Sequence, residues 1–489
     1  MIDTLSMERL NRTTANSPVH HPERVLQFGA GNFLRAFSNW MIDILNRKTD
    51  FDGNVIVVKP TQGGDYTALR IQDGLFHAVI DGIEDGHMVS EISLITCISK
   101  IIHAYDQWET FLATAEQPEI RFIISNTTEA GIAYSDKDSF LDNPPSEFPA
   151  KLTRWLYHRF LHFEGDGDKG CILLPCELIE NNGNVLLQNI LKYVTLWNLG
   201  ADFQTWLDTN NFFCNTLVDR IVSGYPQDRA QDILTRTGFQ DSLLVAGELY
   251  HSWIIEAPPI VKKELPISKT DLNVQFVENL TPFRKLKVHI LNGAHTAMVP
   301  VGYIAGLYTV KDCMDDKMVF NFIRGLLLEE IGPTLEDFSK DQVENYIDTV
   351  LDRFKNPTLK HFLLSISLNS ISKFKTRLLP VFEAYCTQQG TFPKHIAFSL
   401  ACLIRFYKGE FGGKEIALND DKDTLLFFKN EWNTVTYGNG TLPEMVHTIL
   451  SNRNIFNKDL TRYNGLADYV AHVIFNIEQN GVKNSLQKL

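Results

Sequence analysis

The sequence lacks several features that would each define a class of protein. Its seven cysteines include no Cys-x-x-Cys pair and no cysteine and histidine cluster with zinc spacing, so we expect reduced thiols and no metal site. No run reaches the roughly 18 uninterrupted apolar residues that a membrane-spanning helix requires. The first 24 residues contain no apolar segment of the kind found in secretory signals. These absences predict a soluble, cytoplasmic protein.

Positive charge is also in short supply. Lys+Arg 46 against Asp+Glu 59 leaves a formal net charge of −13, which disfavours nucleic acid and anionic membranes as partners. Because the protein carries a net negative charge, binding of an anionic small molecule would require local basic side chains that neutralise its charge. The sequence contains no internal repeat or low-complexity tract. Its 489 residues are more than a single domain with one hydrophobic core usually contains. Two globular domains are therefore expected.

The two parts of the chain differ in their predicted secondary structure. Up to about residue 270, helical stretches alternate with short apolar runs at 25–28, 54–58, 121–125 and 171–175. Such alternation predicts βαβ units around a mainly parallel sheet. Beyond about residue 280, long helical patterns dominate, at 319–331, 341–354, 360–374 and 395–409. We therefore predict an α/β fold, with a parallel-sheet domain over 1–275 and a mostly α-helical domain over 276–489.

A glycine-rich turn follows the first apolar run. Gly29 and Gly31 come directly after Phe28, and apolar residues recur at helical spacing from Phe33 onward. A backbone without Cβ atoms can approach a pyrophosphate closely, and a helix N-terminus offers it unpaired N–H groups. Leu34 stands where the full dinucleotide-binding fingerprint has a third glycine, so the match is partial. The turn predicts nucleotide binding, with an ordinary tight turn as the alternative.

Polar residues follow the later strands, at the edge where parallel sheets bind ligands. Lys59 follows the second strand, where an enzyme that prefers NAD often carries an acidic residue, so the choice between NAD and NADP stays open. Thr128 and Glu129 follow the third strand in NTTEAGI, and Glu177 follows the fourth in CELIENNG. Either segment is a capped turn or a ligand loop. This edge is the predicted binding edge of the first domain.

The segment KVHILNGAHTAM places an amine, an amide and an imidazole on one face of a predicted helix. At about 100° per residue, Asn292 lies about 60° and Lys287 about 80° from His295, whereas His289 falls on the opposite side. One bound oxygen can meet all three groups, as a proton-transfer site requires. The alternative is a solvated lysine near a histidine that is satisfied by local hydrogen bonds.

These motifs resemble those of the polyol-specific long-chain dehydrogenases, the mannitol dehydrogenase family. GAGNFLRAF is similar to the GxGxFxRA phosphate loop of that family, and Lys287-x4-Asn292-x2-His295 is similar to its catalytic motif. The strings SNTTEAGI, PCELIENNG, NTLVDRIVSGYP, LNGAHTA and RFKNPTLKH resemble members that act on hexuronates most closely. The similarity runs from about residue 20 almost to the C-terminus. It implies a Rossmann-like first domain and a mostly α-helical second domain.

The resemblance also implies roles for individual residues. It implies that NAD is the cofactor, bound by Phe28, Gly29, Ala30, Gly31, Asn32, Phe33, Arg35, Thr128 and Glu129. By the same resemblance Lys287 is the catalytic acid/base, Asn292 holds the reacting oxygen, and His295 is its imidazole partner. No metal is implied.

Substrate contacts are implied for Asp219, His361 and Lys373, and three departures from the family pattern bear on them. Leu178 stands where mannitol dehydrogenases have an asparagine, Ser365 stands in place of an arginine, and His361 in place of an aspartate. Those changes would suit a substrate whose end group is not a plain hydroxymethyl. The residues available to neutralise a carboxylate are Lys360, His361, Lys373, Lys375 and Arg377.

The implied activity is reversible, NAD-dependent hydride transfer between a nicotinamide and a small keto-hexuronate or its aldonate, in hexuronate breakdown. The alternatives are a sister activity on a hexuronate of other stereochemistry, or a hexitol dehydrogenase. A nucleotide-binding regulator is disfavoured because a pure sensor has no use for the proton donor Lys287. The substrate is a small molecule, and the sequence leaves the oligomeric state open.

Overall fold

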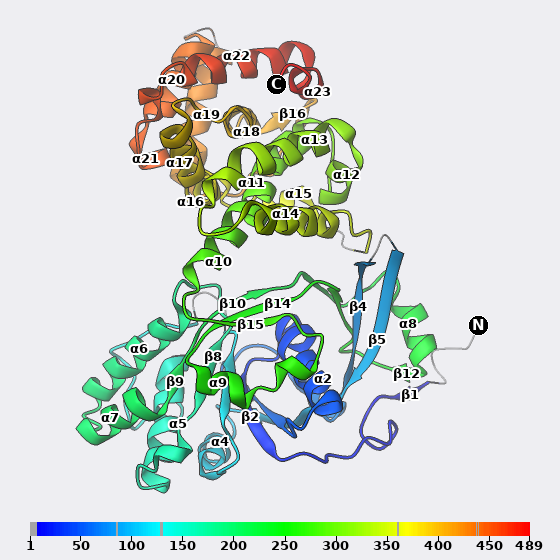
Figure 1. Ribbon diagram of the computed structural model, residues 1–489, viewed down its shortest axis with the longest axis vertical. Coiled ribbons are helices and arrows are strands. Elements are labelled where there is room, and N and C mark those ends of the chain that lie inside the picture. Colours follow the sequence, from blue (N-terminus) through cyan, green and yellow to red (C-terminus); the bar gives the residue numbers. More distant parts are fainter. Residues whose placement is uncertain (1–6, 85–86, 128–130, 359–360, 437, 439) are drawn as a thin grey trace. The chain divides into compact units, whose positions relative to one another are not determined.

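The computed structural model describes residues 7–84, 87–127, 131–358, 361–436, 438 and 440–489. By its internal contacts the chain divides into two units, residues 1–280 and residues 281–489. Each unit has buried apolar clusters of its own. Sheets form the framework of the first unit, whereas helices make up most of the second (Figure 1). The predicted fold class, a parallel-sheet domain followed by a mostly α-helical one, is confirmed.

A six-stranded parallel sheet is the centre of the first unit. In spatial order its strands are β6 (Ile98–His103), β3 (Asn54–Lys59), β2 (Glu23–Phe28), β7 (Phe122–Ser125), β8 (Ile172–Pro175) and β9 (Phe212–Phe213). Counted along the chain within this sheet, the order is three, two, one, four, five, six, which is the Rossmann order. The order reverses between β2 and β7. A ligand crevice is therefore expected at the carboxyl end of β2.

Both faces of this sheet are covered, because successive strand residues point to opposite sides. Val57 joins the cluster that contains Phe37 and Met41, whereas Val58 joins the cluster on the other face with Trp155. β3 is buried along its whole length, which explains why it reads as a nearly continuous apolar run. The helices of this unit are α1 (Asn32–Leu34), α2 (Trp40–Lys48), α3 (Thr67–Ile71), α4 (Trp108–Ala113), α5 (Phe148–His162), α6 (Asn182–Leu196), α7 (Ala201–Asn210), α8 (Ala230–Thr237) and α9 (Pro259–Glu264).

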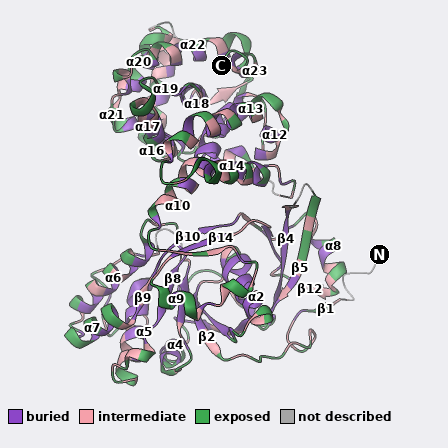
Figure 2. Cartoon of the chain, viewed as in Figure 1, coloured by how far each residue is buried: buried purple, intermediate pink, exposed green. Residues whose placement is uncertain are grey.

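Two smaller sheets in the first unit were not predicted. One has the order β11 (Val222–Gly224), β13 (Val245–Glu248), β4 (Phe76–Glu84) and β5 (His87–Ile95), and the other the order β10 (Asn215–Asp219), β14 (Ser252–Glu256) and β15 (Val274–Val277). β1 (Glu8–Arg9) pairs with β12 (Phe239–Gln240). The strands β4 and β5 form a long antiparallel hairpin, in which β4 is largely buried and the first part of β5 is exposed (Figure 2).

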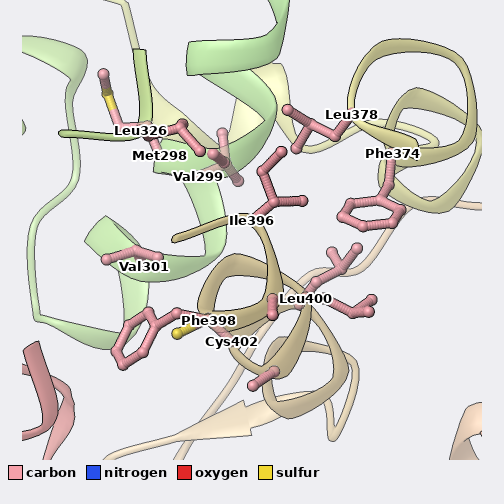
Figure 3. Packing of buried hydrophobic residues seen from close by; sticks show 14 of the residues in the cluster. Met298, Val299, Val301, Leu326, Phe374, Leu378, Ile396, Phe398, Leu400 and Cys402 are labelled. Carbon is pink, nitrogen blue, oxygen red and sulfur yellow. The ribbon is translucent and has the colours of Figure 1, made fainter. Parts of the chain in front are cut away.

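The second unit is built around two apolar helices, α11 and α18. Every residue of α11 except Tyr303 is buried, and Figure 3 shows Val299 and Val301 of this helix in one cluster with Ile396 and Phe398 of α18. The helices are α10 (Thr281–Leu286), α11 (Gly293–Ile304), α12 (Val310–Asp315), α13 (Lys317–Gly325), α14 (Lys340–Phe354), α15 (Leu363–Ile366), α16 (Ser370–Arg377), α17 (Leu379–Gln389), α18 (Lys394–Phe406), α19 (Lys422–Thr436), α20 (Leu442–Ser451), α21 (Arg453–Phe456), α22 (Leu466–Asn480) and α23 (Val482–Leu486). A two-stranded hairpin joins β16 (Glu410–Phe411) to β17 (Lys414–Glu415).

One helical prediction was wrong in its extent. The pattern over 360–374 predicted a single helix, but the structure has α15 and α16 with a break between them. The break is at Asn369, whose φ of 52° is left-handed. Asparagine tolerates that conformation, and the apolar periodicity did not reveal the interruption.

Candidate active site

The glycine turn lies at the carboxyl end of β2, where the strand order reverses. Gly29 has a φ of +99°, and a Cβ there would lie 3.3 Å from the carbonyl oxygen of Asn126. A Cβ at Gly31 would meet no atom within 4 Å, so this side of the turn is open. Leu34 is buried and lies 3.6 Å from the Cβ position of Gly29. The turn thus has a conformation that favours glycine, and one of its faces is open to a ligand.

A buried polar network that sequence reasoning missed holds the turn. Gln27 is fully buried, and its Nε2 donates to the carbonyl oxygen of Gly29 over 2.9 Å. Its Oε1 accepts from Ser38 Oγ at 3.1 Å and Asn39 Nδ2 at 2.9 Å. Ser38 and Asn39 belong to η2 (Arg35–Asn39), a turn of π-helix between α1 and α2. A buried glutamine inside an apolar strand was the available signal, because it needs partners.

The other proposed residues of the turn differ in exposure. Phe28 is buried, and its ring packs 4.8 Å from that of Phe148. Gly31 and Asn32 are exposed, and Phe33 is half-buried. Arg35 is buried, and its guanidinium donates to the backbone oxygen of Leu243 and to Asn32 Oδ1. Burial lowers the pKa of Arg35 to about 10. Arg35 therefore ties the turn to a neighbouring loop within the first unit.

Glu177, which follows β8, holds the start of the loop after β7 at Thr127. Glu177 accepts hydrogen bonds from Ser125 Oγ at 3.0 Å and from the backbone N–H of Thr127 at 2.9 Å. Burial raises the pKa of this carboxyl, and the hydrogen bonds oppose that shift. Thr128 and Glu129, the two residues proposed for this loop, lie outside the described residues. Leu178, which replaces the family asparagine, is 63% exposed.

Lys59 at the end of β3 is only 5% exposed and is engaged inside the first unit. Its Nζ donates to the carbonyl oxygen of Gln62 at 2.9 Å and lies 2.6 Å from His103 Nε2. The ammonium therefore already has two partners inside the first unit.

Asp219 is the last residue of β10 and is buried. The next residue, Arg220, was not singled out by the sequence. Its Nη1 donates to the carbonyl oxygen of Ala36 in η2 at 2.6 Å, and its guanidinium lies 4.0 Å from the centre of the Trp40 ring. Burial lowers the pKa of Arg220 to about 9. Arg220 fixes the π turn that follows the glycine turn.

Lys287 and Asn292 are the first and last residues of a second π turn, η6 (Lys287–Asn292), which leads into α11. Hydrogen bonds in such a turn join residues five apart, so these two residues lie one above the other. The spacing of 100° per residue, expected from an α-helix, is therefore wrong within this turn, although the helical segment itself is present. Both residues are half-buried. The π turn brings the amine and the amide onto one face.

His295, in the first turn of α11, is 7% exposed. Its ring stacks on that of Phe354 at 4.4 Å and meets the ring of His361 edge-on at 5.0 Å. Its Nε2 is buried and has no hydrogen-bond partner within the described part of the chain. Burial, with the positive charges of neighbouring basic residues, holds the pKa of His295 well below its usual range. The imidazole is therefore neutral at physiological pH.

Basic side chains surround this imidazole. The residues that oppose its protonation, besides burial, are His361, Arg353, Arg377 and Lys373. Lys373 and Arg377 lie four residues apart on α16, and Lys373 Nζ donates to the carbonyl oxygen of Ile366 at 2.7 Å. The sequence had nominated His361, Lys373 and Arg377 for an anion, whereas it missed Arg353, a buried residue near the end of α14. The local sequence of Arg353 reads as an ordinary helix end.

Arg377 also holds the π turn of the second unit. Its Nη1 donates to the carbonyl oxygen of Asn292 at 3.5 Å and to Thr296 Oγ1 at 3.3 Å. Its own carbonyl oxygen lies 2.8 Å from Nδ1 of His289. His289, which the sequence separated from the proton-transfer face, therefore faces α16.

Two kinds of feature are absent from the described part of the chain. No group of three or more His, Cys, Asp or Glu side chains there could hold a metal ion. No helix there is long and apolar enough to cross a membrane.

The Rossmann-order sheet, with a glycine turn at the point where its order reverses, defines a dinucleotide-binding class of protein. Residues 23–269 match the model of the mannitol dehydrogenase Rossmann domain, and residues 279–477 match that of the mannitol dehydrogenase C-terminal domain. The chain belongs to the mannitol dehydrogenase family.

Curated relatives cover nearly the whole chain. A protein named altronate oxidoreductase from Yersinia enterocolitica (serotype O:8 / biotype 1B) is 46% identical over 464 residues, which are 95% of this chain and 96% of the relative. One of the same name from Bacillus subtilis (strain 168) is 43% identical over 482 residues, 99% of this chain and 98% of the relative. The chain is therefore an oxidoreductase that acts on a CH–OH group of a small molecule.

Two solved structures share the fold. Pseudomonas fluorescens mannitol 2-dehydrogenase, a ternary complex with NAD and D-mannitol, matches with a TM-score of 0.69 and 20% identity over 98% of this chain and 99% of that one. A D-sorbitol dehydrogenase in substrate-free form matches with a TM-score of 0.78 and 21% identity over 98% of this chain and 100% of that one.

Proposed function

We propose that this protein catalyses the reversible, NAD-dependent reduction of D-tagaturonate to D-altronate in hexuronate breakdown. The observation that carries the proposal is the set of basic residues around His295, next to the π turn with Lys287 and Asn292. A protein with a net charge of −13 needs such a cluster to attract a sugar acid. The relatives named altronate oxidoreductase support the same substrate class.

The cofactor is NAD, and the glycine turn fits it. The open face at Gly31 allows a pyrophosphate to approach the backbone, and Gly29 supplies the conformation of the turn. Of the residues that the family resemblance assigns to the cofactor, Gly29, Ala30, Gly31, Asn32 and Phe33 are not buried. The engaged ammonium of Lys59 supports NAD over NADP. When bound, the nicotinamide exchanges a hydride with the carbon of the CH–OH group.

Lys287 is the acid/base of the proposed reaction. In the reducing direction its ammonium donates a proton to the keto oxygen while the carbon gains the hydride, so that a neutral hydroxyl results. The Asn292 amide and a ring N–H of His295 donate hydrogen bonds to the same oxygen as negative charge develops on it. The neutral imidazole suits this role, since it keeps one N–H donor.

The substrate carboxylate is bound by His361 and Lys373, and Asp219 accepts a hydrogen bond from a sugar hydroxyl. The aspartate-to-histidine change at His361 supports an acid substrate, because an aspartate would repel a carboxylate.

One assay tests the proposal. Oxidation of NADH and NADPH is followed separately with tagaturonate, fructuronate and fructose as substrates. We expect the highest kcat/KM for NADH with tagaturonate, and at least tenfold less with fructose, since about 1.4 kcal/mol of carboxylate binding corresponds to tenfold. Equal rates with fructose would contradict the proposed substrate, and faster NADPH oxidation would contradict the cofactor. Higher activity with fructuronate would point to the sister reaction.

A further inference from the structure

Tyr66 contacts the glycine turn directly, although neither its sequence position nor the family motif assigns it a role. Its hydroxyl oxygen accepts a hydrogen bond from the backbone N–H of Ala30 at 2.8 Å. The N–H of Gly29 donates to the carbonyl oxygen of Val58 at 2.9 Å, as part of the sheet. The amide in the middle of the turn is thus satisfied by a side chain from a different segment.

The backbone around Tyr66 is fixed. Tyr66 directly precedes α3, and its carbonyl oxygen accepts from the N–H of Arg70 at 3.0 Å. Asp65 Oδ1 accepts from the N–H of Thr67 at 2.7 Å, which closes the turn before the helix. The side chain of Tyr66 is half-buried, and burial raises the pKa of its phenol, although the nearby charge of Arg35 opposes the shift. The phenol therefore keeps its proton at neutral pH.

A phenol that accepts one hydrogen bond can still donate its own proton. Among the described residues the hydroxyl of Tyr66 makes one hydrogen bond, the one that it accepts from Ala30, so it donates its proton to no described protein group. The turn beside it is open at Gly31. The hydrogen bond from Ala30 polarises the O–H group of Tyr66, which makes this hydroxyl a stronger donor to an anion.

We propose that Tyr66 is a further cofactor-binding residue, whose hydroxyl accepts from the Ala30 N–H and donates to a pyrophosphate oxygen of the dinucleotide. The inference rests on the proposed use of NAD, but it does not depend on the identity of the sugar substrate. Hydrogen bonds from a hydroxyl to a phosphate oxygen are charge-assisted and short. Tyr66 thereby extends the phosphate site from the backbone of the turn to the side chain of the residue that precedes α3.

The test is Tyr66→Phe, which removes only the hydroxyl. Affinity is measured for NADH, for ADP-ribose, which has the pyrophosphate without the nicotinamide, and for adenosine, which has no phosphate. We expect Tyr66→Phe to weaken NADH and ADP-ribose about tenfold each, as for one charge-assisted hydrogen bond, and to leave adenosine unchanged. KM for NADH should rise while kcat at saturating NADH stays the same.

The matched control is Tyr157→Phe, which makes the same chemical change on α5, where the ring packs 5.0 Å from that of Phe203. It should leave all three affinities unchanged. Thermal unfolding checks the fold, and a midpoint within about 2 °C of the wild type excludes a general loss of stability. An unchanged or tighter ADP-ribose affinity in Tyr66→Phe, or an equal loss for adenosine, would overturn the role of Tyr66. A wild-type chain that binds neither NADH nor ADP-ribose would overturn the proposed cofactor itself.

Discussion

Each of the two proposed sites is joined to a π turn, but the turns serve different kinds of chemistry. In the first unit, η2 follows a glycine turn, and the protein groups proposed to contact the ligand there are backbone atoms. In the second unit, η6 itself carries the ligand groups, as the side chains of Lys287 and Asn292. An arginine from a distant segment donates to a carbonyl oxygen of each turn, Arg220 in the first unit and Arg377 in the second. A backbone site is specified by a few consecutive residues, whereas a side-chain site depends on what surrounds it.

The largest expected effect is the loss of the proton donor. Replacing Lys287 with alanine should lower kcat about 10³-fold, within the range for general acid catalysis. NADH affinity should stay unchanged, because the cofactor turn belongs to the first unit. Steady-state kinetics and NADH titration together check both parts. A variant that retains more than a tenth of the wild-type kcat would remove Lys287 from the mechanism.

Substitution of the two arginines should have different effects, mainly on stability at Arg220 and mainly on activity at Arg377. Arg220 is buried and donates to several carbonyl oxygens, so Arg220→Ala should reduce the free energy of unfolding by about 2–4 kcal/mol. Arg377 is half-buried and its bonds to Asn292 and Thr296 are long. Arg377→Ala should therefore lower kcat about tenfold with an acid or a neutral substrate, by loosening η6, and change stability by less than about 1 kcal/mol. Denaturant titration and kinetics distinguish them.

Thr376→Ala is a suitable control for the Arg377 variant. Thr376 is exposed, and its hydroxyl bonds to the backbone of its own helix at Ser372. This variant should behave as the wild type. If Arg377→Ala raises KM only for the acid substrate, Arg377 binds the carboxylate instead of holding the π turn.

Substitution of the two glycines of the turn should affect different properties, stability at Gly29 and NADH binding at Gly31. Gly29→Ala places a Cβ at a φ of +99° and 3.3 Å from a carbonyl oxygen, which should cost about 1–3 kcal/mol of stability. Gly31→Ala meets no atom within 4 Å, so it should leave stability unchanged and weaken NADH binding through the open face. Thermal unfolding with and without NADH measures both effects. Equal stability losses would mean that Gly31 has a structural role as well.

Substrate charge is tested at His361. His361→Ala should lower kcat/KM for tagaturonate about tenfold, the loss of one charge-assisted contact. Turnover of a neutral ketose should change much less. Equal losses with both substrates would indicate that His361 acts on His295, whose ring it contacts at 5.0 Å, instead of on the carboxylate.

One further expected effect is on the pH dependence of stability. Burial lowers the pKa of His251 in the first unit to about 4, and the positive charge of Arg220 adds to the shift. An unfolded histidine titrates near pH 6.5, so between about pH 6.5 and 4 the unfolded chain binds a proton that the folded chain does not. Stability should therefore fall with decreasing pH by about 1.4 kcal/mol per unit for this group. His251→Gln should flatten that slope in calorimetric unfolding, and an unchanged slope would contradict it.

Much of the first unit could be predicted from local sequence. The four expected strands are those buried on both sides, where burial makes most positions apolar. The edge strand β6 was missed, because ISKIIH mixes polar and apolar residues. The smaller sheets were missed as well, since their pairing joins segments such as β4 and β13 that lie far apart along the chain.

The sequence by itself determined the glycine turn and nominated Lys287, Asn292 and His295 as a candidate set, because a turn conformation and closeness along the chain are local properties. Tertiary structure alone decided that a π turn aligns the amine with the amide, that Arg353 joins the basic residues around His295, and that Tyr66 and Gln27 hold the glycine turn. The physical reason is that hydrogen bonds and charge neutralisation act through space, between residues whose separation along the chain carries no local pattern.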